Sequence, residues 1–313
     1  MINEIKYKDH AEWLKIRNNY IGGSDAGAVV GMNPFKSAYA LWAEKTGKAP
    51  PFEENLTTEV GAYLEEFVAK MFCNETGKKV RKKNTTTVNE LYPFACANID
   101  RQIVGEKAFL EIKTTNSLPI MRQLRNLDEF PELYYCQCQH YLAVTEYEKC
   151  YLAVLVNCRE LKIYEMERDE DEINALMNAE KEFWSLVKNN EPPAPDGTKS
   201  TSDTLTVLYP ESNGEEIDLF GWDEDLDIIA RLNAQIKELT AIKDEKVNII
   251  KEAMKDAEKG VSDKYKISYA NQSRKTFDSK RFVKEHPDYD LTEYYNTTTS
   301  RVFRITEITK KEI

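Results

Sequence analysis

Hydrophobic and polar positions follow two different periods along the first 190 residues of this 313-residue chain. A period of three to four residues, bounded by capping residues and glycines, predicts helices, and a period of two predicts strands. Helices are expected at about 8–20, 26–30, 38–46, 57–76, 133–145 and 169–189. Strands are expected over 78–88, 91–104, 107–115, 149–158 and 160–168.

The pattern changes after residue 190. The run "NNEPPAPDGTKSTSD" (189–203) is rich in Pro, Gly, Ser and Thr and predicts a linker. Beyond it, 223–258 predicts one long helix with a partial heptad-like apolar stripe, and the last fifty residues alternate β-prone and charged residues. We therefore expect a main domain over 1–190, a linker over 191–204, and a coiled-coil-like and small β-rich extension over 205–313.

Composition excludes several classes of protein. A net charge of −11 disfavours a nonspecific DNA-coating protein, but it permits a nuclease whose basic groups are confined to one channel. Six cysteines without a C-x-x-C and three scattered histidines disfavour zinc, iron–sulfur and His-based centres, and favour buried free thiols. The chain has neither a run of 18 apolar residues nor a signal-peptide core, so we expect a soluble intracellular protein away from membranes.

The first candidate catalytic residues lie in the predicted hairpin "FACANIDRQIVGEKAFLEIKTT". A two-residue turn at Gly105–Glu106 would place Asp100 directly opposite Glu111. Cross-strand neighbours on one face have Cβ atoms about 4.5–5.5 Å apart. Two carboxylates that close repel each other unless a cation lies between them or one takes up a proton.

A divalent cation suits this pair. Mg²⁺ prefers oxygen ligands, so Asp100, Glu111 and the carbonyl oxygen of Ile112 are candidates. Lys113 shares the face of Glu111 and could orient a nucleophile or stabilise charge on a scissile phosphate. A D-x10-E-x-K pattern alone is weak in a chain with 31% charged residues, so a solvated outer strand face remains the alternative.

Two upstream features add to the constellation. On the helix "GAYLEEFVAKMF", Glu65 falls at the edge of the apolar face and could reach a cleft, whereas Glu66 should be solvated. Ser24 is expected to cap a short helix, and its free N–H groups beside Gly22–Gly23 suit an anion. A plain surface glutamate and an ordinary capped helix are the corresponding alternatives.

The motifs "WLKIRNNYIGGSDAGAVVGMNPFKSAYALWAEKTG", "GAYLEEFV", "NIDRQIV…FLEIKTT" and "YYCQCQHYLAVT" occur in this order. Together they resemble the YqaJ-type viral recombinase family, in the phage lambda exonuclease-like branch of the PD-(D/E)XK nucleases, over about residues 10–190. The resemblance implies an α/β (α+β) fold with a restriction-endonuclease-like core, in which a mixed central sheet is flanked by helices.

The resemblance also assigns roles to residues. It marks five as catalytic: Glu65, Asp100, Glu111, Lys113 and Gln137. It implies a metal site made of Asp100, Glu111, the Ile112 backbone oxygen and Glu65. It associates Arg17 and Ser24, with Gly23 beside them, with the DNA 5′-phosphate. One departure is that Ile99–Asp100 replaces the usual Pro-Asp pair, which changes no ligand.

The implied activity is that of a Mg²⁺-dependent 5′→3′ exonuclease, with Mn²⁺ as a substitute ion, acting on double-stranded DNA ends. Its 3′ overhangs would serve a phage single-strand annealing protein of the RecT/Bet type in the bacterial cytoplasm, the gene being carried by a phage or prophage. An endonuclease of the same fold and a non-catalytic DNA-end binding scaffold remain alternatives. The family suggests a homo-oligomeric ring, a trimer, although the long helix could equally mediate a dimer. The basic runs at 78–83 and 271–282 are consistent with DNA contacts or with solvated surfaces.

Overall fold

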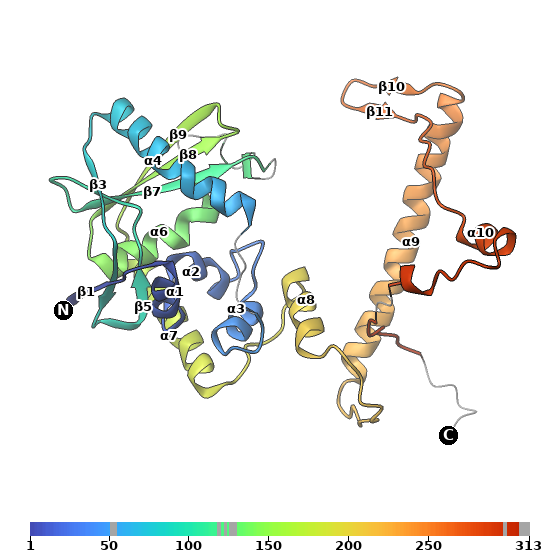
Figure 1. Ribbon diagram of the computed structural model, residues 1–313, viewed down its shortest axis with the longest axis horizontal. Coiled ribbons are helices and arrows are strands. Elements are labelled where there is room, and N and C mark those ends of the chain that lie inside the picture. Colours follow the sequence, from blue (N-terminus) through green and yellow to red (C-terminus); the bar gives the residue numbers. More distant parts are fainter. Residues whose placement is uncertain (51–54, 118–119, 122–123, 125–129, 297–298, 307–313) are drawn as a thin grey trace. The chain divides into compact units, whose positions relative to one another are not determined.

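The computed structural model forms two compact units, Met1–Tyr209 and Pro210–Ile313. It describes the chain except for residues 51–54, 118–119, 122–123, 125–129, 297–298 and 307–313 (Figure 1). The end of the last β-prone stretch therefore lies outside the described residues.

A mixed five-stranded sheet forms the centre of the first unit, in the order β3-β6-β7-β8-β9. Its strands are β3 (Val80–Lys82), β6 (Arg101–Ile103), β7 (Ala108–Thr115), β8 (Lys149–Val156) and β9 (Glu160–Glu167). Strands β7 and β8 run parallel, and the other neighbours are antiparallel. A parallel pair needs a crossover, and α6 (Glu132–Thr145) supplies it.

A second sheet of four strands lies beside the first, in the order β1-β4-β5-β2. Its strands are β1 (Ile2–Lys6), β2 (Ile21–Gly22), β4 (Thr85–Asn89) and β5 (Tyr92–Ala97). The expected strand over 78–88 is thus divided between β3 and β4, and that over 91–104 between β5 and β6. Strands β3 and β4 belong to different sheets, and so do β5 and β6. The expectation that each of the two ranges forms one continuous strand was therefore wrong.

Helices cover both faces of the five-stranded sheet (Figure 1). On one face Val68 and Phe72 of α4 (Leu56–Thr76) pack against Leu110 and Tyr151. On the other, apolar side chains of α6 join Phe109 and Cys150 in the main core. The remaining helices of this unit are α1 (His10–Asn18), α2 (Gly23–Val29), α3 (Ala38–Lys45), α7 (Glu170–Asn189) and α8 (Lys199–Leu208).

The β6–β7 hairpin has the expected register. Arg101 pairs with Leu110 and Gln102 pairs with Phe109, so the same register brings Asp100 level with Glu111. Gly105 in the turn has φ of +87°, a conformation that side chains other than glycine disfavour. The hairpin consists of β6 and β7 alone, because β5 belongs to the four-stranded sheet.

The first unit extends further than the expected domain boundary at residue 190. Helix α8 begins inside the run expected to be a linker, and the backbone N–H of Ser37 donates to Ser200 Oγ at 3.1 Å. Thr201 Oγ1 donates to Ser37 Oγ at 2.9 Å. These contacts attach α8 to the start of α3, so the segment that follows the Pro-rich stretch belongs to the first unit.

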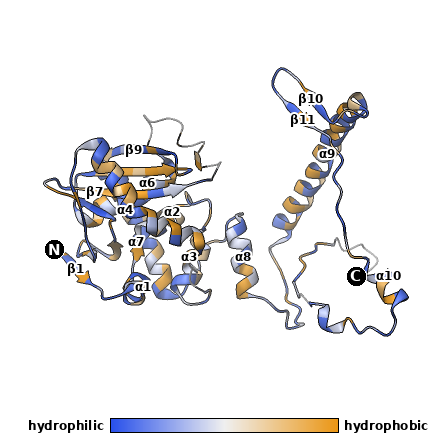
Figure 2. Ribbon diagram, turned by 45° about the horizontal axis from the view of Figure 1, so that its top comes forward, coloured by the Kyte–Doolittle hydropathy of each residue, from blue (hydrophilic) through white to orange (hydrophobic). Residues whose placement is uncertain are grey.

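The second unit is built on the long helix α9 (Asp223–Met254), which ends four residues before the expected 258 and has no buried residue. A short hairpin of β10 (Lys259–Val261) and β11 (Lys266–Ser268) follows, then α10 (Ser279–Glu285) and the single turn η1 (Thr292–Tyr294). Apolar and polar residues alternate along α9 (Figure 2). No described helix is both long and apolar enough to cross a membrane.

A buried histidine anchors α6 to its neighbours. His140 is fully buried, with Nδ1 2.7 Å from Glu180 Oε1 and Nε2 2.9 Å from the Cys96 carbonyl oxygen. The Cys96 carbonyl oxygen can only accept, so the Nε2–H group donates to it, and Nδ1 shares a proton with Glu180. Burial lowers the pKa of His140, but Glu180 more than offsets it and the net pKa is raised. Burial also raises the pKa of Glu180, although the charge and hydrogen bond of His140 lower it in part.

This pair predicts a pH-dependent stability. The raised pKa of His140 means that the folded chain keeps this proton to higher pH than the unfolded chain does, so the free energy of unfolding is expected to fall as pH rises above about 6.5. His140→Gln leaves Glu180 buried without a cation and is expected to cost ~3 kcal/mol at pH 6. Glu180 alone then keeps a proton in the folded chain, so the fall is expected to begin lower, above about pH 4.3. Urea unfolding between pH 4 and pH 8 measures both effects, with Glu182→Gln on the exposed side of α7 as the control. An unchanged onset of the fall in His140→Gln would contradict the assignment.

Candidate active site

The polar face of β7 carries Glu111 and Lys113 next to α6. Glu111 is 2% exposed, and its Oε1 accepts hydrogen bonds from Lys113 Nζ and Gln137 Nε2, each at 2.6 Å. Its other oxygen, Oε2, is buried and has no hydrogen-bond partner among the described residues. A buried carboxylate oxygen without a partner is costly, so this position suits a further ligand.

Asp100 lies beside Glu111 and binds the same strand. Its Oδ2 accepts the backbone N–H of Ile112 at 2.7 Å. The N–H and C=O of one strand residue point toward the same edge, so the Ile112 carbonyl also faces the side of Asp100. Burial and then the charge of Glu111 raise the pKa of Asp100 well above its usual value, despite Lys113 nearby. The two carboxylates repel each other, as the register predicted.

Lys113 is the cation of this group. Burial lowers its pKa, but Glu111 and Asp100 more than offset that effect and hold the pKa above its usual value. Its Nζ lies 5.7 Å from the centroid of the Tyr134 ring on α6. Lys113 is therefore a fixed positive charge at the carboxylate pair rather than a solvated lysine.

Glu65 lies at the margin of α4 and is held by other cations. Arg101 Nη1 donates to Glu65 Oε1, and Lys82 Nζ lies 3.4 Å from the same oxygen. Glu66 was expected to be free in solvent, and its side chain is 64% exposed, but it accepts from Arg101 Nη2 at 3.0 Å. In the described parts of the chain, no three His, Cys, Asp or Glu side chains form a ready-made metal cluster. The structure thus brings Asp100 and Glu111 together with Lys113 and Gln137, and leaves Glu65 paired with Arg101.

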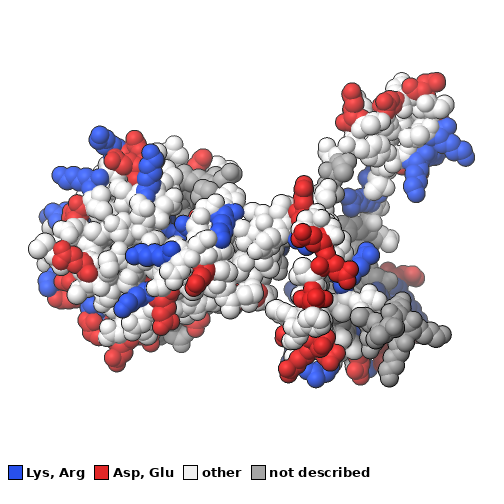
Figure 3. All heavy atoms as spheres, turned by 90° about the horizontal axis from the view of Figure 1, so that it is seen from below, with Lys and Arg blue, Asp and Glu red and all other residues white. Residues whose placement is uncertain are grey.

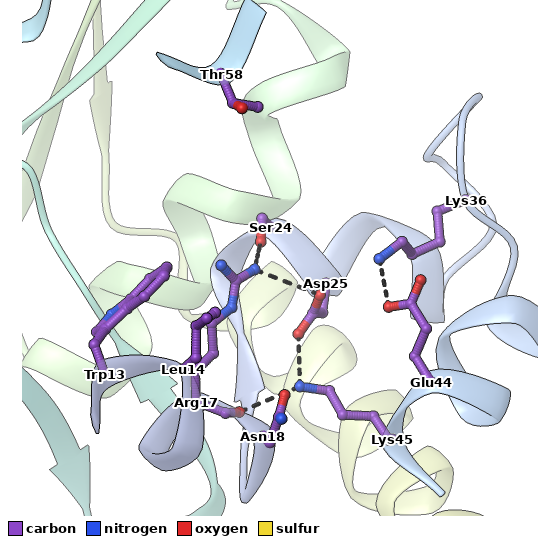
Figure 4. Close-up of a pocket in the computed structure, with 10 residues that line it drawn as sticks. All are labelled: Trp13, Leu14, Arg17, Asn18, Ser24, Asp25, Lys36, Glu44, Lys45 and Thr58. Atoms are coloured by element: carbon purple, nitrogen blue, oxygen red, sulfur yellow. Dashed lines mark hydrogen bonds and ion pairs between the residues drawn. The ribbon is translucent and has the colours of Figure 1, made fainter. Parts of the chain in front are cut away.

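Arg17 and Ser24 meet at a pocket of about 410 Å³ (Figure 4). Arg17 Nη2 donates to Ser24 Oγ, and the guanidinium lies 5.3 Å from the Trp13 ring. Helix α2 begins at Gly23 with Gly22 as its N-cap, so the expectation that Ser24 caps it was wrong. The Gly22 N–H instead donates to Asp25 Oδ2 at 3.2 Å. Ser24 occupies the first turn and still faces Arg17.

A buried ion pair in the wall of this pocket was missed by sequence reasoning. Asp25 Oδ2 lies 3.1 Å from Lys45 Nζ, and its Oδ1 lies 3.8 Å from Arg17 Nη2. Burial opposes ionisation, but Lys45 and Arg17 outweigh it and hold the pKa of Asp25 below its usual value. Lys45 also donates to the Tyr20 carbonyl oxygen at 2.7 Å. Asp25 therefore fixes the position of Arg17, and the one available signal was an acid three residues after Gly22 at a helix start.

Tyr141 of α6 connects the pocket to the carboxylate pair. Burial and then Glu111 raise its pKa well above the usual value, while Arg17 acts in the opposite direction. Tyr141 also lies one helical turn after Gln137, which contacts Glu111, so α6 contributes to both sites. Gly23 is packed against this ring, since a Cβ at Gly23 would lie 2.5 Å from Tyr141 Cε1.

Gly23→Ala tests this packing. The added methyl group must displace the Tyr141 ring, and we expect a loss of ~1–3 kcal/mol in stability. Gly27→Ala in the same helix is the matched control, because its Cβ would meet nothing closer than 3.7 Å. That change should leave stability equal or raise it by up to ~1 kcal/mol. Thermal unfolding of the two variants distinguishes them, and equal behaviour would contradict the close packing.

Most side chains of the basic run at 78–83 form ion pairs or hydrogen bonds with nearby side chains. Lys78 Nζ bonds Glu106 at 2.6 Å, Lys82 pairs with Glu65, and Arg81 Nε donates to Gln102 at 2.9 Å. Lys, Arg, Asp and Glu are interspersed on the face of the first unit shown in Figure 3. These contacts reduce the positive charge that the run could offer to DNA.

The fold and site define a class of protein, and comparisons agree with it. A solved structure of the Laribacter hongkongensis alkaline exonuclease (LHK-Exo) matches with a TM-score of 0.50 and 20% identity, covering 57% of this chain and 93% of that one. The complex of LHK-Exo with dAMP gives 0.51 and 19%, with the same coverage. This similarity establishes the mixed α+β PD-(D/E)XK-like fold of phage-type exonucleases.

The family follows from sequence similarity. The family model of the YqaJ-like viral recombinase domain matches residues 12–148. Protein YqaJ of Bacillus subtilis (strain 168) is 38% identical over 283 residues, covering 88% of each chain. The chain therefore belongs to the YqaJ-like viral recombinase family. Its resemblance to this family, and the fold that the resemblance implied, are confirmed.

Proposed function

We propose that this protein is a Mg²⁺-dependent deoxyribonuclease that digests one strand of linear duplex DNA in the 5′→3′ direction. The observation that carries the proposal is the buried pair of Asp100 and Glu111 with Lys113 on one strand face. The Arg17 and Ser24 pocket adds a site for the DNA end. Membership in a viral recombinase family supports a role in generating 3′ overhangs for annealing.

The residues present suit a divalent metal ion. Glu111 Oε2 is buried and unpartnered among the described residues, and Asp100 is under charge repulsion from Glu111. Carboxylate and carbonyl oxygens are the ligands that Mg²⁺ prefers. Asp100, Glu111 and the Ile112 carbonyl would hold the ion, with Glu65 as a fourth candidate, and Mn²⁺ would be accepted as well. When bound, the ion would supply Lewis acidity toward the phosphate and activation of water.

The surrounding side chains have separable roles in this proposal. Lys113 would orient the attacking water and stabilise the negative charge that develops on the phosphate. Gln137 fixes the Glu111 carboxylate through its bond to Oε1, so that Oε2 faces the reacting centre. Tyr134 and Tyr141 keep the pair in a low-dielectric setting, in which a nearby charge acts more strongly.

The pocket at Arg17 would hold the terminal 5′-phosphate. A guanidinium and a hydroxyl group are suitable donors for a phosphate, and Asp25 and Lys45 below them keep the donors in place. Holding the end in one position selects which phosphodiester reaches Asp100 and Glu111. The annealing-protein partner and the trimeric ring stay predictions.

Digestion of end-labelled linear duplex with and without Mg²⁺ tests the proposal. We expect mononucleotide release from the 5′-phosphorylated strand only with Mg²⁺, and an intact complementary strand. A covalently closed circular duplex in the same assay should remain uncut. Cleavage of circles would replace the exonuclease by an endonuclease of the same fold. Binding to DNA ends without cleavage, in Mg²⁺ and also in Mn²⁺, would support a non-catalytic scaffold instead.

A further inference from the structure

Arg101 directly follows Asp100 and is 3% exposed at the start of β6. Its Nη1 donates to Glu65 Oε1 and to the Asp100 carbonyl oxygen, the latter at 2.7 Å. Its Nη2 donates to Glu66 Oε2 at 3.0 Å. One guanidinium thus connects the backbone of a proposed metal ligand to two neighbouring acids of α4, Glu65 and Glu66.

The positive charge of this guanidinium is balanced by the carboxylates of Glu65 and Glu66. Burial lowers the pKa of Arg101, but the hydrogen bond and charge of Glu65 outweigh it and the net pKa is raised. A planar guanidinium has a fixed fork of donors, so it sets the direction of the carboxylates that it binds. Lysine could not reach the Asp100 carbonyl, Glu65 and Glu66 with the same geometry.

Glu65 needs such a partner to stay near the site. Its side chain lies at the margin of α4 and is 24% exposed, so its carboxylate is free to turn toward water unless a cation holds it. The contacts with Arg101 and Lys82 both fall on Oε1, and they keep the carboxylate at the Asp100 end of the hairpin.

We propose that Arg101 is a positioning residue that holds Glu65 beside Asp100 for binding of the divalent cation. The inference rests on the proposed function, because it requires a metal site at Asp100 and Glu111. It assigns to Arg101 an effect on metal affinity that acts through Glu65 and not through contact with DNA.

Calorimetric titration of the full chain with Mn²⁺, without DNA, tests this role. Arg101→Gln is expected to weaken binding by about 10–100-fold, as outer contacts of metal ligands typically do when removed. In a Glu65→Gln background, Arg101→Gln should cause no further loss. Arg101→Lys should give an intermediate loss, and Arg159→Gln, at an exposed arginine after β8, should have no effect.

The outcomes separate the two hypotheses. If the original chain binds no Mn²⁺ and cleaves no DNA, the proposed function fails. If it binds Mn²⁺ but Arg101→Gln binds equally or more tightly, only the role of Arg101 is overturned. An equal loss in the Glu65→Gln background also overturns it, because Arg101 would then act through the fold. Should Arg101→Gln fail to fold by circular dichroism, Arg101→Lys and the double variant decide by the same criteria.

Discussion

Asp100→Asn is expected to lower the cleavage rate by at least ~10³-fold, about 4 kcal/mol in activation free energy. The amide can still accept the Ile112 N–H, so the hairpin is kept while the negative charge is lost. Binding to duplex ends should persist, since the Arg17 pocket is untouched. Single-turnover cleavage and fluorescence anisotropy measure the two effects, and Asp171→Asn on the exposed start of α7 is the control.

The same substitution has a stability signature. Without metal, Asp100 is buried beside Glu111 under repulsion, so removal of its charge should leave the melting temperature equal or higher. Added Mg²⁺ should raise the melting temperature of the original chain and not that of Asp100→Asn. Normal turnover in the variant would remove the metal-site hypothesis, whereas loss of folding would leave the comparison to Glu111→Gln.

Lys113→Met should separate rate from metal binding. Lys113 contacts Glu111 Oε1 and leaves Oε2 to the proposed ion, so the variant should still bind Mn²⁺. The cleavage rate at saturating Mg²⁺ should nevertheless fall ~10²–10³-fold, because a donor to the developing charge is lost. A larger loss in affinity than in rate would instead show that Lys113 acts by positioning Glu111 for the metal ion.

Arg17→Gln should abolish the preference for a phosphorylated end. We expect kcat/KM on 5′-phosphorylated duplex to fall ~10²-fold, with little change on the 5′-hydroxyl duplex, because a charged clamp on the phosphate is lost. Lys45 remains 3.1 Å from Asp25, so the buried acid keeps a cation and the fold should persist. Lys15→Gln on the exposed side of α1 is the control. An equal loss on both substrates would indicate a structural role for Arg17.

Local pattern and short-range register were sufficient to predict which residues of the hairpin face one another. The turn at Gly105–Glu106 fixed the pairing of Arg101 with Leu110, and alternation then put Glu111 and Lys113 on one face. The family resemblance marked Gln137, which does contact Glu111. The inferences from register succeeded because the strand period acts over a few residues.

Long-range partners could not be derived in this way. Nothing local shows that β5 and β6, three residues apart, join different sheets. The pairings of Glu65 with Arg101 and of Asp25 with Lys45 span 36 and 20 residues and depend on tertiary packing. Helix α8 could not be predicted from the sequence, because its Ser and Thr residues are typical of linkers as well as of a helix that is buried on one side.

The three residues between β5 and β6 have a mechanical consequence. Asn98 donates to Thr86 Oγ1 in the four-stranded sheet at 2.9 Å, Ile99 is buried in the main core, and Asp100 binds β7 of the five-stranded sheet. Any sliding of one sheet over the other would therefore change the gap between Asp100 and Glu111. Thr86 and Ile99 lie outside the proposed metal and DNA sites but help to set the width of that gap, so variation there would be a route to tune the ion selectivity of the proposed site without altering its carboxylates.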